Sequence, residues 1–245
     1  MTRPRTAIVT GAASGIGAAT VVELATRGYR VAAIDRDGPG VRAIVAAVGA
    51  QHLALELDIA DETSIVAAFA DAVKTLGGLD ALVTSAGSAD MTPFMDLDSA
   101  TFHRVYHDNV VGTFLCIREA AKHMPPGGRI CTVASIAGLR GGGLSGTAAY
   151  AASKGAVLAL TKNAARALAD RGIAVNTIAP GATMTPMIAD VFANEAHRKR
   201  VESMNVMNRA AKAEEIARAI AFLVSPEASY VDGATLVADG GLCMY

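Results

Sequence analysis

Short apolar runs alternate along the chain with longer segments whose apolar residues recur at helical spacing. Apolar runs rich in β-branched residues are typical of strands buried on both faces, whereas helical spacing is typical of amphipathic helices. The pattern predicts strands at residues 6–10, 30–34, 52–57, 81–84, 129–134, 174–178 and 234–237. It predicts a first helix that ends near residue 27 and further helices at residues 62–76, 99–124, 150–170, 187–206 and 213–224.

Strands that alternate with helices indicate an α/β fold, because parallel strands need long crossover connections. Apolar strands without polar alternation must be covered on both faces. We therefore expect a doubly wound, Rossmann-type parallel sheet of about seven strands with helices on both faces. No proline- or serine-rich linker, internal repeat or low-complexity tract divides the sequence, so one domain is expected over residues 1–245.

The composition argues against several classes of partner. A net charge of −1 leaves no basic footprint for nucleic acid or an anionic membrane, and no apolar run is long enough for a membrane span. Cys116, Cys131 and Cys243 are odd in number and show no paired spacing, which is typical of free thiols in a reducing compartment. The N-terminus shows no signal-peptide core. We expect a soluble cytoplasmic protein with no nucleic-acid or membrane partner.

Two histidines have a spacing that zinc ligands can have. His103 and His107 are four positions apart, so they share a face of the predicted helix. No third ligand is evident nearby, and the helix itself explains the spacing. No metal site is therefore expected.

A glycine-rich turn follows the first predicted strand and opens the first predicted helix. Glycines in this context allow a tight turn and a close approach of the backbone to a pyrophosphate, and the helix N-terminus adds free N–H groups. The candidate phosphate-binding residues are Gly11, Ser14, Gly15, Ile16 and Gly17. The same pattern also fits a strand-to-helix turn that needs flexible residues, so both interpretations stay open.

Asp35 ends the second predicted strand, where an acidic residue suits the free hydroxyls of a ribose. Its charge would repel the 2′-phosphate of NADP, whereas Arg36 can bind that phosphate or stack on adenine. The turn has alanines at positions 12 and 13 and no basic residue, so NAD is favoured over NADP. Asp35 could also be a capping or turn residue, as the sequence Asp37-Gly-Pro-Gly40 allows.

The segment from Ser135 to Lys154 is the main candidate for chemistry. Tyr150 and Lys154 are four residues apart and share a face of the predicted helix. A free tyrosine has a pKa of about 10, which a cation one turn away would lower. The pair would exchange a proton with an alcohol or carbonyl oxygen, to which Ser135 could donate a hydrogen bond. Alone, the Tyr-x-x-x-Lys pattern also fits an ordinary exposed pair.

The candidate residues recur at the ends of predicted strands. In open α/β sheets, ligands bind outside the carboxyl ends of the strands. The strand-end candidates are Gly11, Asp35, Asp58, Ser85, Ser135 and Pro180. Their convergence favours one shared site.

These motifs together resemble the short-chain dehydrogenase/reductase family in its single-domain, NAD(P)-dependent form, over nearly the whole chain. The segment Thr10-Gly-x-x-x-Gly15-x-Gly17 resembles its cofactor loop. The residues that resemble its catalytic tetrad are Asn109, Ser135, Tyr150 and Lys154. The resemblance implies that Tyr150 exchanges the proton and Ser135 orients the substrate oxygen. It also implies that Lys154 lowers the tyrosine pKa and binds the nicotinamide ribose, while Asn109 positions a proton-relaying water.

The resemblance implies further contacts to the cofactor. Asp58 and Ile59 would flank adenine, and the segment after Pro180 would hold the nicotinamide end. The implied cofactor-binding residues beyond the glycine turn are Asp35, Arg36, Asp58, Ile59, Ser85, Ala86, Gly87, Tyr150, Lys154, Pro180, Gly181, Thr183 and Thr185. A homotetramer or homodimer is also implied.

Two features depart from the family pattern. The family usually has Asn-Asn-Ala-Gly after the fourth strand, where this chain has Thr84-Ser-Ala-Gly87. Ser135 and Tyr150 are two residues further apart than is common, and we place the extra length in a substrate-lining loop at residues 140–146. Arg140 in that loop could turn toward the substrate or into solvent. A substrate lid is expected around residues 184–208.

The sequence favours an oxidoreductase that transfers a hydride between NAD(H) and a secondary alcohol or ketone, with Tyr150 as general acid/base. One alternative is a non-catalytic NAD-binding sensor protein, which would have no need for a tyrosine beside a lysine. Another is an epimerase or dehydratase that retains its cofactor. The short C-terminal part leaves little room for a sugar-nucleotide domain and argues against that alternative.

Overall fold

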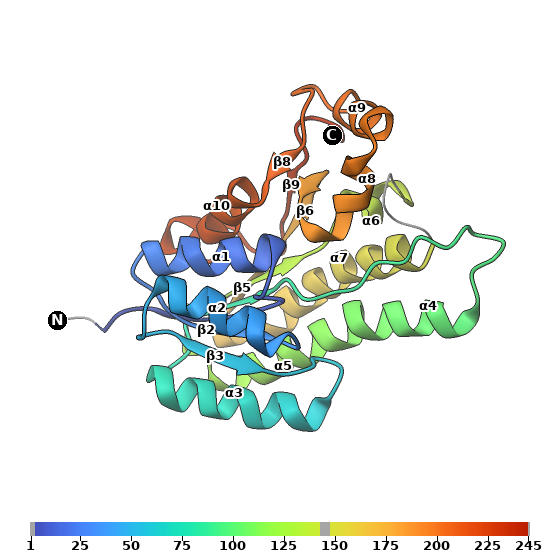
Figure 1. Cartoon of the computed structure of the whole chain (residues 1–245). Coiled ribbons are helices and arrows are strands. Elements are labelled where there is room, and N and C mark those ends of the chain that lie inside the picture. Colours follow the sequence, from blue (N-terminus) through green and yellow to red (C-terminus); the bar gives the residue numbers. More distant parts are fainter. Residues whose placement is uncertain (1–2, 143–147, 245) are drawn as a thin grey trace.

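The computed structural model describes residues 3–142 and 148–244. Within them lies a parallel sheet of seven strands in the order β3-β2-β1-β4-β5-β6-β9 (Figure 1). The strands are β1 (Thr6–Thr10), β2 (Arg30–Asp35), β3 (Leu53–Glu56), β4 (Ala81–Thr84), β5 (Arg129–Val133), β6 (Ala174–Pro180) and β9 (Thr235–Ala238). The predicted fold class is confirmed. Each predicted strand is present: β1 and β4 have the predicted ends, and the others differ by one or two residues at an end.

Helices cover both faces of the sheet (Figure 1). One face packs against α1 (Gly15–Thr26), α2 (Gly38–Val48) and α10 (Ala213–Leu223). The other face packs against α3 (Glu62–Leu76), α5 (Gly112–His123) and α7 (Ala148–Leu168). Successive strand residues point to opposite faces, so Ala7 and Val9 enter the first of these cores and Ile8 enters the second. This double coverage is why the strands are apolar throughout.

Helix α3 illustrates how local sequence sets an element's ends. Asp61 caps its N-terminus by accepting hydrogen bonds from the Thr63 and Ser64 N–H groups. Gly77 ends it in the left-handed conformation, with φ of 81°. Between them, Phe69 is fully buried against the sheet, which contributes about 1.5–3 kcal/mol.

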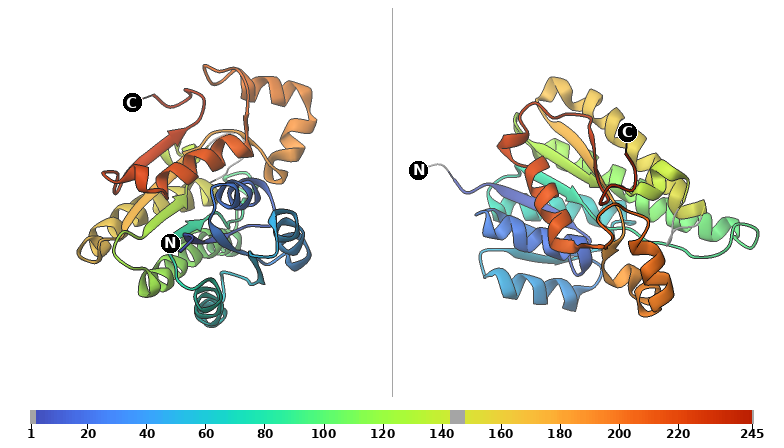
Figure 2. Two further views of the ribbon diagram at one scale, coloured as in Figure 1. Left: turned by 90° about the vertical axis from the view of Figure 1, so that its left-hand side faces the viewer. Right: turned by 90° about the horizontal axis from the view of Figure 1, so that it is seen from above.

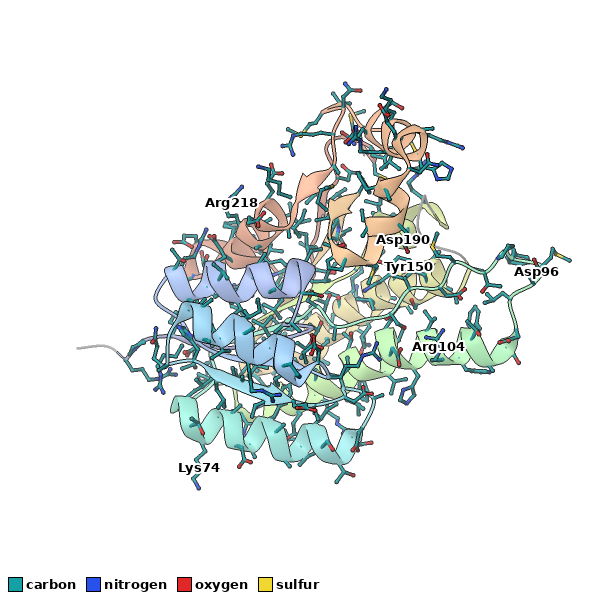
Figure 3. The ribbon with its side chains drawn as sticks, viewed as in Figure 1. Lys74, Asp96, Arg104, Tyr150, Asp190 and Arg218 are labelled. Atoms are coloured by element: carbon teal, nitrogen blue, oxygen red, sulfur yellow. The ribbon has the colours of Figure 1, made fainter. Side chains whose placement is uncertain are left out.

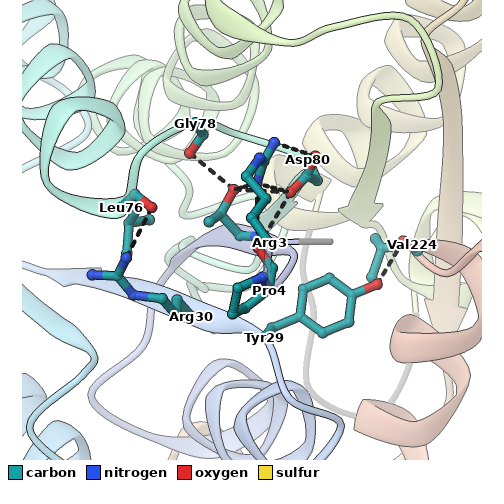
Figure 4. A network of polar contacts seen from close by, with 9 residues as sticks. Arg3, Pro4, Tyr29, Arg30, Leu76, Gly78, Asp80 and Val224 are labelled. Atoms are coloured by element: carbon teal, nitrogen blue, oxygen red, sulfur yellow. Dashed lines mark hydrogen bonds and ion pairs between the residues drawn. The ribbon is translucent and has the colours of Figure 1, made fainter. Parts of the chain in front are cut away.

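Asp80 links two chain segments at the amino ends of the central strands β1 and β4 (Figure 4). Its carboxylate accepts two hydrogen bonds from Arg3, at 2.7 and 2.8 Å, and one from the Thr6 N–H at 2.8 Å. Burial raises the pKa of Asp80, but the hydrogen bonds from Arg3 and Thr6 outweigh it and hold the pKa below its usual value. The amino ends of the strands lie opposite the carboxyl ends, where the candidate residues gather.

The predicted helix at 99–124 is interrupted. It consists of α4 (Ser99–Tyr106), one π-helical turn η1 (His107–Val111) and α5. A π turn inserts an extra residue into the helix and often marks a functional position. Here it contains Asn109, and no single residue in the sequence signals it.

Several elements were not predicted. Asp37 caps α2 by accepting from the Gly40 N–H at 3.0 Å, so the Asp-Gly-Pro-Gly segment starts a helix. The predicted helix at 187–206 is instead a 3₁₀ turn η3 (Pro186–Ile188), α8 (Ala189–Ala193) and α9 (Glu195–Glu202), because Asn194 starts a new cap. The remaining elements are α6 (Ile136–Arg140), β7 (Thr183–Met184), β8 (Ala211–Lys212) and the 3₁₀ turns η2 (Ala169–Arg171) and η4 (Pro226–Ala228).

The segment with α8 and α9 projects beyond the sheet (Figures 1 and 2), and the chain that follows α9 contacts the segment that follows β9. The Met207 N–H donates to the Gly240 carbonyl at 3.2 Å, which ties the two segments together. Asp239 folds the C-terminal end into a hook by accepting from the N–H groups of Gly241, Leu242 and Cys243. Among the described residues, no helix combines the length and apolar character of a membrane span.

Candidate active site

A cleft of about 400 Å³ opens at the carboxyl ends of the strands. It brings together nearly all of the residues predicted from the sequence. Those that line it are Gly11, Ser14, Gly15, Ile16, Asp35, Arg36, Asp58, Ile59, Ser85, Ala86, Gly87, Ser135, Tyr150, Lys154, Pro180, Gly181, Thr183 and Thr185. Gly17 and Asn109 do not line the cleft and lie behind its wall.

The glycine turn is shaped by close backbone contacts. Gly11 has φ of 68°, and a Cβ there would lie 2.5 Å from the Ala86 nitrogen. A Cβ on Gly17 would overlap the Gly11 carbonyl oxygen, so Gly17 supports the turn from within α1. Ser14, at the N-cap of α1, makes no side-chain capping bond, which leaves first-turn N–H groups available to a ligand. The turn therefore fits the pyrophosphate of a dinucleotide.

Asp35 supports the turns beside it and also faces the cleft. Its carboxylate accepts from the Ala13 N–H at 2.9 Å and from the Asp37 N–H at 3.0 Å, so it supports the two turns beside it. It also lines the cleft, next to the exposed Arg36. The carboxylate is thus held in place at the rim, where a ribose hydroxyl could donate to it.

Tyr150 and Ser135 lie together on one wall of the cleft. Tyr150 is in the first turn of α7, and Figure 3 shows it beneath the segment that carries Asp190. Ser135 follows β5 and caps α6, accepting from the Ala137 N–H at 3.1 Å. Burial raises the pKa of Tyr150, and a hydrogen bond with the Ser135 side chain opposes that rise.

Lys154 is buried one turn further along α7. Its Nζ donates to the Val133 carbonyl at 2.8 Å and lies 5.7 Å from the centroid of the Tyr150 ring. Burial lowers the pKa of Lys154 to about 8, so the ammonium form still predominates at pH 7. Burial thus dominates the pKa of Tyr150, and the lowering of that pKa by Lys154 stays a prediction.

Asn109 is fully buried behind the cleft. Its Oδ1 accepts from the Ser88 N–H at 2.7 Å, and its Nδ2 donates to the Ser88 carbonyl and to the Ser153 hydroxyl. The side chain therefore joins the loop after β4 to the residue that precedes Lys154. Both hydrogens of Nδ2 are used in these bonds, so the side chain holds the two segments together.

The segment Thr84-Ser-Ala-Gly87, which departs from the family pattern, contains a polar atom without a partner. Thr84 Oγ1 is buried and makes no hydrogen bond within the described part of the chain. The loop is held instead by Thr10, whose carbonyl accepts from the Ser85 N–H at 3.2 Å and whose hydroxyl accepts from the Ala86 N–H at 3.4 Å.

Some residues of the cleft were not expected. Ser88 donates to the Asp108 carboxylate at 2.7 Å, and both line the cleft. The sequence indicated a place for Asp108 in the cleft only through its position next to Asn109. Leu242 reaches the cleft through the hook that Asp239 holds, and nothing in the local sequence indicated this. Ile188 lines the cleft together with Met187, and both belong to the segment 184–208 that was expected to form a lid.

Arg140 lines the cleft and is exposed, at the end of α6. Arg140 therefore belongs to a helix and not to a loop. Of the residues that follow it, 141 and 142 are described. The rest of the predicted loop at 140–146, from residue 143 onward, lies outside the described residues.

Comparisons with known proteins agree with this arrangement. Residues 11–243 match the family model described as enoyl-(acyl carrier protein) reductase. The chain is 41% identical over 97% of its length to an uncharacterized short-chain type dehydrogenase/reductase of Sinorhizobium fredii, and it spans 43% of that protein. It is 40% identical to cis-4-hydroxycyclohexanecarboxylate dehydrogenase of Sinomonas cyclohexanicum, over 97% of this chain and 96% of that one.

A solved structure agrees as well. The crystal structure of a dehydrogenase/reductase from Sinorhizobium meliloti 1021 superposes with a TM-score of 0.91 at 36% identity, covering 98% of this chain and 95% of that chain. The chain is more than 30% identical to several relatives over almost its full length. This likeness agrees with the sheet order and with the cleft at the ends of the strands. The chain therefore belongs to the short-chain dehydrogenase/reductase family.

Proposed function

We propose that the protein is an NAD-dependent oxidoreductase that interconverts a secondary alcohol and a ketone. The observation that carries the proposal is the position of the Tyr150 hydroxyl, beside Ser135 in a cleft that also contains the glycine turn and Asp35. A bound nicotinamide dinucleotide would supply or accept the hydride. The test is nicotinamide absorbance during a screen of alcohols and ketones.

The roles of this chain's residues follow from their positions. The Tyr150 hydroxyl would give a proton to the carbonyl oxygen in reduction and remove it from the alcohol in oxidation. Ser135 would donate a hydrogen bond to the same oxygen. Lys154, as a buried ammonium, would stabilise the phenolate and bind the ribose. Asn109 would hold the loop and helix that position Lys154, beside the proton path to solvent.

The cofactor is proposed to be NAD rather than NADP. Asp35 would accept hydrogen bonds from the adenosine ribose, and its charge would repel a 2′-phosphate. Gly11, Ser14, Gly15, Ile16 and Gly17 would form the pyrophosphate site. Asp58 and Ile59 would flank adenine, Arg36 would lie over it, and Ser85, Ala86, Gly87, Pro180, Gly181, Thr183 and Thr185 would hold the nicotinamide half.

Replacing Asp35 with alanine is expected to narrow the preference for NAD. The wild type should use NAD with a higher kcat/KM than NADP, and Asp35→Ala should reduce that ratio about tenfold, because repulsion of the phosphate is lost. The two cofactors are compared at one substrate concentration. Asp37→Ala, which removes a neighbouring acid, is the control. Equal or better use of NADP by the wild type would refute the assignment.

A non-catalytic NAD-binding sensor is the alternative function. Lys154 is a buried cation that lies next to Tyr150. Burying a charge costs free energy, and a protein that only binds NAD has no need for a buried cation beside a tyrosine. A sensor would bind NADH without turnover of any alcohol or ketone, which the same absorbance screen would reveal.

The substrate is proposed to be a small alicyclic alcohol or ketone. The Sinomonas relative is named for a hydroxycyclohexanecarboxylate, and here Met187, Ile188 and Leu242 give the cleft an apolar wall that suits a saturated ring. We further propose that residues 184–208 act as a lid within a single domain over residues 1–245. The break between α8 and α9 gives this segment a hinge.

A homotetramer or homodimer in the cytoplasm is proposed. Helices α5 and α7 carry small residues, and Tyr106 and Phe114 remain exposed on the same stretch of chain, at 37% and 43%. Light scattering on the purified protein should give the mass of four or two copies, and a monomer at micromolar concentration would contradict the proposal. The free thiols Cys116, Cys131 and Cys243 are consistent with a reducing compartment.

A further inference from the structure

The cleft contains a cation to which the proposed function gives no role. Arg140 lines the cleft together with Ser135 and Tyr150, and it makes no hydrogen bond or ion pair within residues 3–142 and 148–244. Some exposed arginines are paired, such as Arg42 with Glu56 at 3.2 Å. An unpaired guanidinium at the wall of a cleft is available to a ligand.

The backbone that carries Arg140 is fixed. A Cβ on Gly138 would lie 2.5 Å from the Gly155 nitrogen, so α6 packs directly on the backbone of α7 beside Lys154. Gly141 ends α6 with φ of 76°, and its N–H and that of Gly142 both donate to the Ala137 carbonyl. The base of the Arg140 side chain is therefore held relative to Tyr150, which lowers the entropy lost when it binds a ligand.

The surroundings of Arg140 do not neutralise it. The C-terminal hook lies nearby: burial and Asp239 raise the pKa of the Cys243 thiol, and the charge of Arg140 opposes that rise. The Asp239 carboxylate is already occupied by three N–H groups at 2.6–3.2 Å. Asp108, another carboxylate of the cleft, accepts from Ser88. Neither acid forms an ion pair with Arg140.

The other charged groups of the cleft have different positions. Lys154 is buried and donates to the Val133 carbonyl. Arg36 follows Asp35, at the end proposed for the adenosine. Arg140 is thus the exposed cation that shares the substrate half of the cleft with the apolar Met187 and Leu242.

We propose that Arg140 binds a carboxylate of the substrate, on the far side of an apolar ring or chain from the reacting carbon. The guanidinium would form two parallel hydrogen bonds with the carboxylate, and the apolar body would lie against Met187 and Leu242. The position of the reacting carbon rests on the proposed function, whereas the binding of the carboxylate does not. The substrate class is therefore a hydroxy acid or keto acid whose acid group is remote from its alcohol or ketone.

The binding test uses ligands that cannot react. Cyclohexanecarboxylate and cyclohexanecarboxamide are titrated by calorimetry into the NAD⁺-saturated protein. The wild type should bind the carboxylate at least about tenfold more tightly than the amide, because a hydrogen bond to a charged group is worth that much. Arg140→Gln should lower the affinity for the carboxylate about 10- to 100-fold and the affinity for the amide less than about twofold. Arg140→Lys should keep part of the preference for the carboxylate.

The control is Arg171→Gln, which removes the same charge from an exposed position on η2 and should behave as the wild type. Equal weakening of both ligands by Arg140→Gln would overturn the proposal, as would a wild type that does not prefer the carboxylate. A rise in KM for NAD⁺ in Arg140→Gln would place this residue at the cofactor and would also overturn it.

Turnover separates this proposal from the proposed function. With 4-hydroxycyclohexanecarboxylate and its carboxamide, Arg140→Gln should raise KM for the acid selectively and leave kcat for the amide unchanged. Unchanged kinetics on the acid would contradict the role of Arg140. If neither compound is oxidised while binding of cyclohexanecarboxylate still depends on Arg140, the carboxylate site stands and the oxidation of this alcohol is refuted.

Discussion

Tyr150→Phe is expected to lower kcat by about 10²–10⁴-fold while NADH binding stays within about threefold of the wild type. The substitution keeps the ring that packs in the cleft and removes only the hydroxyl that hydrogen-bonds with Ser135. The proton then has no side-chain donor or acceptor at the reacting oxygen. Single-turnover rates and NADH titrations on the same preparation measure the two effects.

The matched control is Tyr230→Phe, at a fully exposed tyrosine, which should leave both quantities unchanged. Loss of NADH binding together with turnover in Tyr150→Phe would show that the phenol serves the cofactor site instead. A variant that keeps wild-type turnover would refute the assignment of Tyr150 as the general acid/base.

Lys154→Ala is expected to shift the pH dependence of alcohol oxidation upward by about one unit or more. Oxidation requires the Tyr150 phenolate, so activity rises as the pH passes the pKa of that phenol. Burial already raises this pKa, and the Lys154 ammonium is the nearby cation that can stabilise the phenolate. Removing the cation should therefore move the midpoint to higher pH and weaken NADH binding.

The difference between the wild type and Lys154→Ala should depend on pH in a defined direction. Lys154 has a pKa lowered to about 8, so it is charged below that pH and loses its charge above it. Because a charged Lys154 favours the phenolate, the wild type should be more active than Lys154→Ala below the midpoint of the variant, and the two profiles should converge above that midpoint. Lys162→Ala removes an exposed lysine from the same helix and should keep the wild-type profile. If Lys154→Ala keeps the wild-type midpoint, Lys154 does not tune Tyr150.

The amino-acid sequence by itself determined the sheet and the place of the cleft. Apolar runs without alternation require coverage on both faces, and a parallel sheet brings all of its carboxyl ends to one edge. The glycine turn could be located because Gly11 and Gly17 meet other backbone atoms too closely for any side chain. Helical spacing placed Tyr150 and Lys154 on one face, Ser135 stood at a strand end, and their convergence with the other strand-end residues favoured a shared site.

Only the tertiary structure decided the features that depend on segments distant in sequence. The π turn at Asn109 goes with hydrogen bonds to Ser88 and Ser153, which no local pattern contains. Leu242 enters the cleft because Asp239 folds the chain back near its end. Burial, which is a property of the packed molecule, set the direction of the Tyr150 and Lys154 pKa shifts. Spacing places residues on one face of a helix, but desolvation depends on everything packed around that face.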